Sequence, residues 1–124
     1  MVTMSSEYSI YLYREKVDLR KGISGLSGIV RSEMKMNPNT AKSIYVFSGS
    51  NPRIKKILVR ERNHFDLTQI RLDSGKFFKP VIDESRRFGK ICWSDLVMLT
   101  EASVYGKVDA CQGRNEALSA SAVG

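Results

Sequence analysis

Hydrophobic and polar positions change their spacing several times along the chain, and each change indicates an element. Residues 8–13 are rich in β-branched and aromatic side chains, which suit a pleated, half-buried surface and predict a first strand. In residues 19–35 the apolar side chains recur at steps of three and four, so they share one face of an amphipathic helix. This helix is expected to end near Met36, before Asn37 and Pro38.

Further strands are predicted where short apolar runs alternate with turn-forming residues. The runs are residues 43–47, 54–60 and 65–72, and a tight turn at 73–75 leads into a last strand segment at 76–78. Consecutive strands joined by short turns pair antiparallel. A charged loop at 83–90 then precedes a second, short helix at 93–103. The sequence therefore predicts an α+β fold, in which an antiparallel β-meander of about four to five strands packs on one main helix, with a short C-terminal helix.

Composition along the chain indicates one domain and a tail. Residues 1–106 contain all the predicted elements, and we expect them to form a single α+β domain. From residue 107 to residue 124 the sequence is dominated by small and polar side chains, which predicts a weakly ordered tail.

The start of the first helix carries two local signals. Gly22, Gly25 and Gly28 lie three residues apart, and we interpret them as permitting close packing of the helix on the sheet. Their spacing matches neither of the common phosphate-binding glycine fingerprints. Asp18 precedes the helix and is expected to cap it, because its carboxylate can accept hydrogen bonds from the first backbone N–H groups.

Charge makes a polyanion a plausible partner. The chain has 20 Lys and Arg against 13 Asp and Glu, a formal net charge of +7. Its two cysteines, Cys92 and Cys111, lack a zinc-site spacing and are expected to be free thiols. The sequence shows neither a signal-peptide core nor an apolar run long enough to span a membrane, so a cytoplasmic location without membrane contact is expected.

Candidate catalytic chemistry is sparse. The single histidine, His64, falls in a predicted hairpin loop, where a solvated turn residue is the simplest interpretation. A nuclease or transposase site would need several carboxylates converging on metal ions, and the acidic residues show no such spacing. We therefore predict no catalytic residue, no cofactor and no metal. A cryptic nuclease is a further hypothesis, and it would require those acidic residues to meet in a cleft with a bound metal ion.

Basic residues are the stronger candidates for a functional surface. Lys56, Arg60 and Arg62 alternate along one predicted strand, so their side chains would project from the same face as a basic stripe, although Leu58 lies within the same alternation. Contacts with phosphates are one role for such a stripe, and a solvated sheet face is the other. The candidate nucleic-acid-binding residues are Arg20, Lys21, Arg53, Lys55, Lys56, Arg60, Arg62, Arg71 and Lys76.

Several motifs resemble one known family. They are the segment 18–22 with Gly25 and Leu26, the aromatic strand 45–47, the Ile/Lys/Leu stretch 54–58, Phe65 with the pattern 71–77, then Pro80 and a closing helix at 96–101. Together they resemble the Orf2 (TnpB-type) accessory proteins of the insertion-sequence sixty-six family of bacterial transposable elements, over roughly residues 8 to 103. The chain departs from the family pattern at 60–64, at 48–51 and at Lys79.

The resemblance implies a small, non-catalytic accessory protein of transposition, encoded beside a separate transposase that holds the catalytic acids. Its expected partners are DNA, contacted through the backbone, and that transposase, with a second copy of the chain as a further candidate. The alternative is a pure protein-interaction module, in which Tyr11, Tyr13, Phe77 and Phe78 form an exposed apolar surface.

Overall fold

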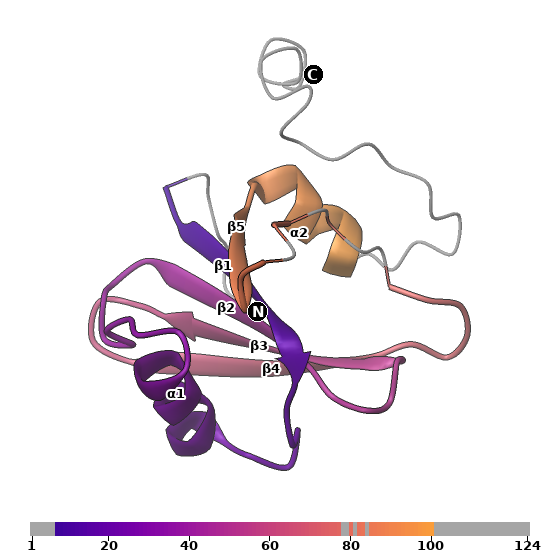
Figure 1. Ribbon diagram of the computed structural model, residues 1–124, viewed down its shortest axis with the longest axis horizontal. Coiled ribbons are helices and arrows are strands. Elements are labelled where there is room, and N and C mark those ends of the chain that lie inside the picture. Colours follow the sequence, from indigo (N-terminus) through magenta and orange to yellow (C-terminus); the bar gives the residue numbers. More distant parts are fainter. Residues whose placement is uncertain (1–6, 78–79, 81, 84, 101–124) are drawn as a thin grey trace, which may run out of the picture.

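The computed structural model describes residues 7–77, 80, 82–83 and 85–100. In chain order these residues form β1 (Ser9–Lys16), α1 (Ile23–Ser32), β2 (Ser43–Ser48), β3 (Ile54–Arg60), β4 (Phe65–Arg71), β5 (Phe88–Ile91) and α2 (Trp93–Thr100). The strands make one five-stranded sheet in the order β4-β3-β2-β1-β5. Figure 1 shows α1 and α2 on opposite sides of this sheet. The predicted α+β class, with one main helix and a short C-terminal helix, is confirmed.

Strand direction is the main difference from the predicted meander. β2, β3 and β4 are consecutive antiparallel neighbours, as predicted, but β1 pairs with β2 in parallel. The reason is that α1 lies between these two strands in the chain and carries it back to the starting end of the sheet, as parallel neighbours require. The sheet is therefore mixed and mostly antiparallel, and the prediction of antiparallel pairing does not hold for β1 with β2.

The last strand also lies elsewhere than expected. Lys76 and Phe77 are not in a strand, and Phe78 lies outside the described residues. The fifth strand is β5, inside the segment predicted as a charged loop, and it pairs antiparallel with β1 from Ile10 opposite Ile91 to Tyr13 opposite Phe88. The predicted helix at 93–103 is found as α2, with residues 101–103 and the tail at 107–124 outside the described part. The division into one domain and a tail stays a prediction.

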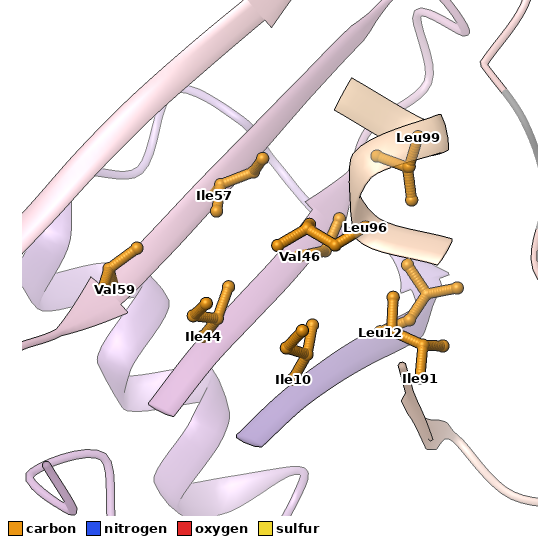
Figure 2. Close-up of a cluster of buried hydrophobic side chains, with 9 residues drawn as sticks. All are labelled: Ile10, Leu12, Ile44, Val46, Ile57, Val59, Ile91, Leu96 and Leu99. Carbon is orange, nitrogen blue, oxygen red and sulfur yellow. The ribbon is translucent and has the colours of Figure 1, made fainter. Parts of the chain in front are cut away.

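Two hydrophobic clusters hold the sheet between the helices. Ile44 and Val46 of β2 point to one cluster, whereas Tyr45 and Phe47 point to the other. Because β2 is covered on both faces, its apolar side chains follow one another without alternation. The cluster on the α2 side, drawn in Figure 2, consists of Ile10, Leu12, Ile44, Val46, Ile57, Val59, Ile91, Leu96 and Leu99. The cluster on the α1 side consists of Tyr13, Leu26, Val30, Met34, Tyr45, Phe47 and Leu58.

Glycines contribute to packing at other positions than expected. An added Cβ at Gly22 or Gly28 would meet nothing within 4 Å, so the interpretation that these helix glycines permit packing on the sheet is wrong for them. Gly49, just after β2, is one position where space is needed, because a Cβ there would lie 2.8 Å from Cγ of Leu19. Gly49 thus allows the loop after β1 to approach the end of β2.

Candidate nucleic-acid interface

The sheet register divides the candidate cations between its two ends. β1 and β2 finish, β3 begins and β4 ends at the same end, as shown by the pairing of Ser48 with Lys55 and of Ile54 with Arg71. The turn before α1 lies there too, since Nζ of Lys56 donates a hydrogen bond to the carbonyl oxygen of Lys21, at 3.2 Å. We call this end of the sheet the basic end. Its candidate cations are Arg20, Lys21, Arg53, Lys55, Lys56, Arg71 and Lys76. The two remaining candidates, Arg60 and Arg62, lie at the opposite end of β3.

The predicted stripe along β3 is interrupted. Lys56 and Arg60 share the α1 face of the sheet, as the alternation predicted. Between them Leu58 is 0% exposed and packs in the cluster under α1. A ligand on this face would therefore meet the two cations as separate points, so a continuous basic stripe does not form.

Arg60 is engaged in packing. Its guanidinium carbon lies 4.7 Å from the ring centroid of Phe65, the residue opposite it on β4. Its Nε atom is buried and has no hydrogen-bond partner among the described residues. Arg62, by contrast, is exposed in the turn between β3 and β4. The Arg60 guanidinium therefore stabilises the β3–β4 pair through its cation–π contact, and it is less available than an exposed cation to bind a phosphate.

The turn before α1 is organised by Asp18, although not as a cap. The Asp18 carboxylate accepts hydrogen bonds from the backbone N–H of Arg20 and from its guanidinium, at distances of 2.9–3.0 Å. These bonds hold the pKa of the Asp18 carboxyl well below its usual range, and they raise that of Arg20. The helix itself begins after Gly22, which provides no side-chain cap, so the predicted capping role is wrong.

As a consequence, the first turn of α1 carries neither a side-chain cap nor an acidic residue. The backbone N–H groups at a helix start give it a partial positive charge, and this charge adds to that of the neighbouring cations. Lys21 is exposed beside the helix start, and Arg20 exposes 92% of its side chain while paired with Asp18. The start of α1 is therefore an electropositive part of the basic end.

Two cations of the basic end tie loops together. Lys55 projects from the α2 face, where its Nζ donates to Oγ of Ser48 at 2.5 Å and lies 5.1 Å from the ring centroid of Phe77. Arg53 donates from its guanidinium to the carbonyl oxygen of Asp73 at 2.9 Å, which joins the turn before β3 to the turn after β4. Arg71 and Lys76 remain exposed beyond these contacts.

An open pocket of about 590 Å³ lies between the loops that follow the parallel strands β1 and β2. Its lining residues are Val17, Asp18, Leu19, Arg20, Gly49, Ser50, Asn51, Ile54 and Gln69. The lining offers both hydrogen-bond donors and hydrogen-bond acceptors, and it includes the carboxylate of Asp18 beside the guanidinium of Arg20. This pocket is the hollowed part of the basic end.

Acidic and metal-binding groups do not converge in the described part of the chain. Within it, no group of three or more His, Cys, Asp or Glu side chains is placed to hold a metal ion. His64 is exposed in the turn after β3, with Nδ1 3.0 Å from Oδ1 of Asn63 and Nε2 3.7 Å from Oδ2 of Asp66. The cryptic-nuclease hypothesis thus gains no site from these residues.

Sequence reasoning missed one further cation and misjudged one thiol. Lys16 is exposed at the last position of β1, in register with Ser48, and so borders the basic end. It could have been found by extending the first strand past its aromatic run. Cys92 is disulfide-bonded, so the expectation of a free thiol is wrong for it. Cys111 lies outside the described residues.

Comparisons with known proteins identify a family for this chain. The family model described as IS66 Orf2 like protein matches residues 8–109, which span every strand and helix from β1 to α2. Neither the curated proteins nor the solved structures contain a match. Among the described residues, every helix is too short or too polar to cross a membrane.

Proposed function

Since this chain belongs to the IS66 Orf2 like family and is therefore an accessory protein of transposition, we propose that it binds DNA during that process. The contacts would be to the phosphate backbone, through the basic end. Such contacts fix position and orientation and carry little sequence information. The element's transposase is the second candidate partner, and DNA and transposase binding are compatible.

One observation supports this proposal most strongly, namely the gathering of cations from separate segments at one end of the sheet. Lys21 comes from the turn before α1, Lys56 from β3 and Arg71 from β4, yet register and the Lys56–Lys21 hydrogen bond bring them to the same end. A protein that neutralises phosphates releases condensed counterions, so clustered cations favour a polyanion over a single small anion. The net charge of +7 acts in the same direction.

The alternative, a pure protein-interaction module, needs an exposed apolar surface, and most of the described residues expected to form it are covered. Tyr13 is only 5% exposed, and Tyr11 stacks on Tyr45 with their ring centroids 5.7 Å apart. Phe77 is half-buried beside Lys55, and Phe78 lies outside the described residues. Among the residues that the structure describes, Ile23 is the one large hydrophobic residue that is exposed, with a relative exposure of 38%. This surface favours a polar, charged partner over a broad apolar contact.

We further propose that the protein supplies no catalytic group to transposition. Its role would be to hold DNA, or to bring DNA and transposase together, while strand cleavage and joining occur elsewhere. That division fits a chain whose described carboxylates, such as Asp18 and Asp83, are engaged in local turns.

Fluorescence anisotropy with labelled duplexes tests DNA binding directly. We expect affinity in the micromolar range or tighter at low salt, falling steeply between about 50 and about 200 mM salt. Equal affinity for an element-end duplex and a scrambled duplex would indicate backbone contacts, and a preference for the element end would add a targeting role. An arm with Mg²⁺ reports cleavage, which would contradict the non-catalytic role. Absence of binding at the lowest salt, together with capture of the purified transposase, would replace DNA by the transposase.

A further inference from the structure

The outer edge of β4 presents backbone groups that the proposed function does not use. β4 is the last strand of the sheet and has 7 residues, whereas β5, at the other edge, has 4. It pairs only with β3 within the described part of the chain, from Ile54 opposite Arg71 to Arg60 opposite Phe65. An edge strand presents unpaired backbone N–H and C=O groups to any chain that can align with it.

The residues whose backbone groups point outward can be assigned. Two hydrogen bonds bracket the β3–β4 ladder, from N–H of Glu61 to the oxygen of His64 and from N–H of Leu72 to the oxygen of Arg53, both at 2.8 Å. In an antiparallel ladder, hydrogen-bonded and non-hydrogen-bonded pairs alternate. Asp66, Thr68 and Ile70 therefore bond to β3. The outward groups belong to Phe65, Leu67, Gln69 and Arg71.

Within the described part of the chain, this edge lacks several of the features that normally block pairing. Proteins protect edge strands with lysine, proline, bulges or a covering segment. β4 has the sequence FDLTQIR, without lysine or proline, and its register with β3 is continuous, without a bulge. Its side chains at Phe65, Leu67, Thr68 and Ile70 are only partly buried within one copy.

The strand is also complementary to itself in the antiparallel direction. Its aromatic residue Phe65 lies at one end and its basic residue Arg71 at the other, and both side chains lie on the α1 face of the sheet. Parallel pairing in register with a second copy would place each Arg71 beside the other, whereas antiparallel pairing places each Arg71 opposite Phe65 of the other copy. The strand therefore favours an antiparallel second copy.

We propose that two copies of this protein pair through β4, with Thr68 on the two-fold axis. In this register the backbone N–H and C=O groups of Leu67 form hydrogen bonds with those of Gln69 of the second copy, and the backbone groups of Phe65 do the same with those of Arg71. Every outward backbone group of the strand is then paired. The Arg71 guanidinium then lies opposite an aromatic ring, a favourable cation–π arrangement. The two sheets become one, and both α1 helices lie on the same side of it.

Sedimentation velocity on the full chain, with reductant present and across a concentration series, tests the dimer. We expect the mass to rise from 14.0 kDa towards twice that value. Gln69→Pro removes an outward N–H while leaving every bond to β3, so it should hold the protein at the monomer mass with unchanged circular dichroism. Thr68→Lys places two like charges face to face at the axis and should do the same. Thr40→Lys, an exposed loop position away from β4, adds the same charge as a control and should leave the dimer intact.

A positive test uses the predicted register. Thr68→Cys places two thiols in a non-hydrogen-bonded cross-strand pair, where Cβ atoms lie about 5 Å apart, close enough for a disulfide. Mild oxidation should give a covalent dimer well above the level of the parent chain. The proposal would be overturned by a wild-type protein that stays monomeric at every concentration. A dimer that persists in both Gln69→Pro and Thr68→Lys would overturn it as well, because it would use another surface.

Discussion

Nζ of Lys56, in the first half of β3, lies 3.2 Å from the carbonyl oxygen of Lys21, in the turn before α1. This hydrogen bond joins the sheet to the loop that starts the main helix. It uses the side chain of one lysine and only the backbone of the other. The two residues can therefore be separated by mutation, one for stability and one for ligand binding.

Lys56→Met should destabilise the protein, because it removes the donor and leaves the carbonyl oxygen of Lys21 without this bond. We expect a loss of about 0.5–1.5 kcal/mol in the free energy of unfolding, the usual range for one hydrogen bond. Lys21→Ala keeps the carbonyl oxygen and is the matched control, with an expected change within about 0.5 kcal/mol. Urea unfolding followed by circular dichroism measures both. Equal losses in the two variants would show that the bond does not tie the turn to β3.

The glycines of the helix and of the loop after β2 should respond to alanine in opposite directions. Gly28 lies inside α1 with nothing within 4 Å of an added Cβ, so Gly28→Ala should stabilise the protein by about 0.5–1 kcal/mol through helix propensity. Gly49→Ala would force a Cβ against Leu19 and should destabilise it by about 1–3 kcal/mol, as overpacking does. Thermal unfolding of the two variants gives the comparison. A destabilised Gly28→Ala variant would contradict the exposed position of that residue.

Tyrosine ionisation should weaken the fold at alkaline pH. The hydroxyl of Tyr8 donates to Oε1 of Glu61 at 2.6 Å, and this bond raises the pKa of Tyr8, while burial raises the pKa values of Tyr13 and Tyr45. A raised pKa means that the folded state holds the proton more tightly than the unfolded state. The stabilisation is complete below the unfolded pKa, about 10, and is lost as pH rises through the folded value.

Urea unfolding between about pH 9 and about pH 11 measures this loss. The free energy of unfolding should fall with pH, and both Tyr8→Phe and Glu61→Gln should make the fall less steep. A slope unchanged in both variants would show that the Tyr8–Glu61 bond does not persist in solution.

The central strands could be predicted from sequence because their signal is local. β2, β3 and β4 are apolar runs separated by turn residues, and their order follows from short connections. The parallel pairing of β1 with β2 could also have been inferred, since a helix between two strands gives the chain the length that a crossover needs. β5 could not, because four residues in a charged segment become a strand only by pairing with β1.

The sequence identified the cations of the candidate site, but it did not predict how the fold arranges them. Alternation correctly placed Lys56 and Arg60 on one face, and Leu58 already indicated that the face is partly covered. Neither the contact of Arg60 with Phe65 nor the grouping of Lys21 with Arg71 is visible in the sequence, because both depend on strand register. Asp18 was expected to cap the helix, and its bonds to Arg20, two residues away, compete successfully for the carboxylate.

The claim that the basic end holds DNA is tested most directly by charge reversal at two of its exposed cations. Lys21→Glu combined with Lys76→Glu changes the charge where binding is proposed, and neither residue lies in β4. Arg62→Glu combined with Lys90→Glu makes the same change at exposed positions outside the basic end. Anisotropy titrations across a salt series, on variants with native circular dichroism, should show at least about a tenfold loss of affinity for the first pair. Its salt slope should also fall by about 2, and the control pair should lose far less. Equal losses in the two double variants would mean that net charge alone drives binding, and would contradict a localised interface at the basic end.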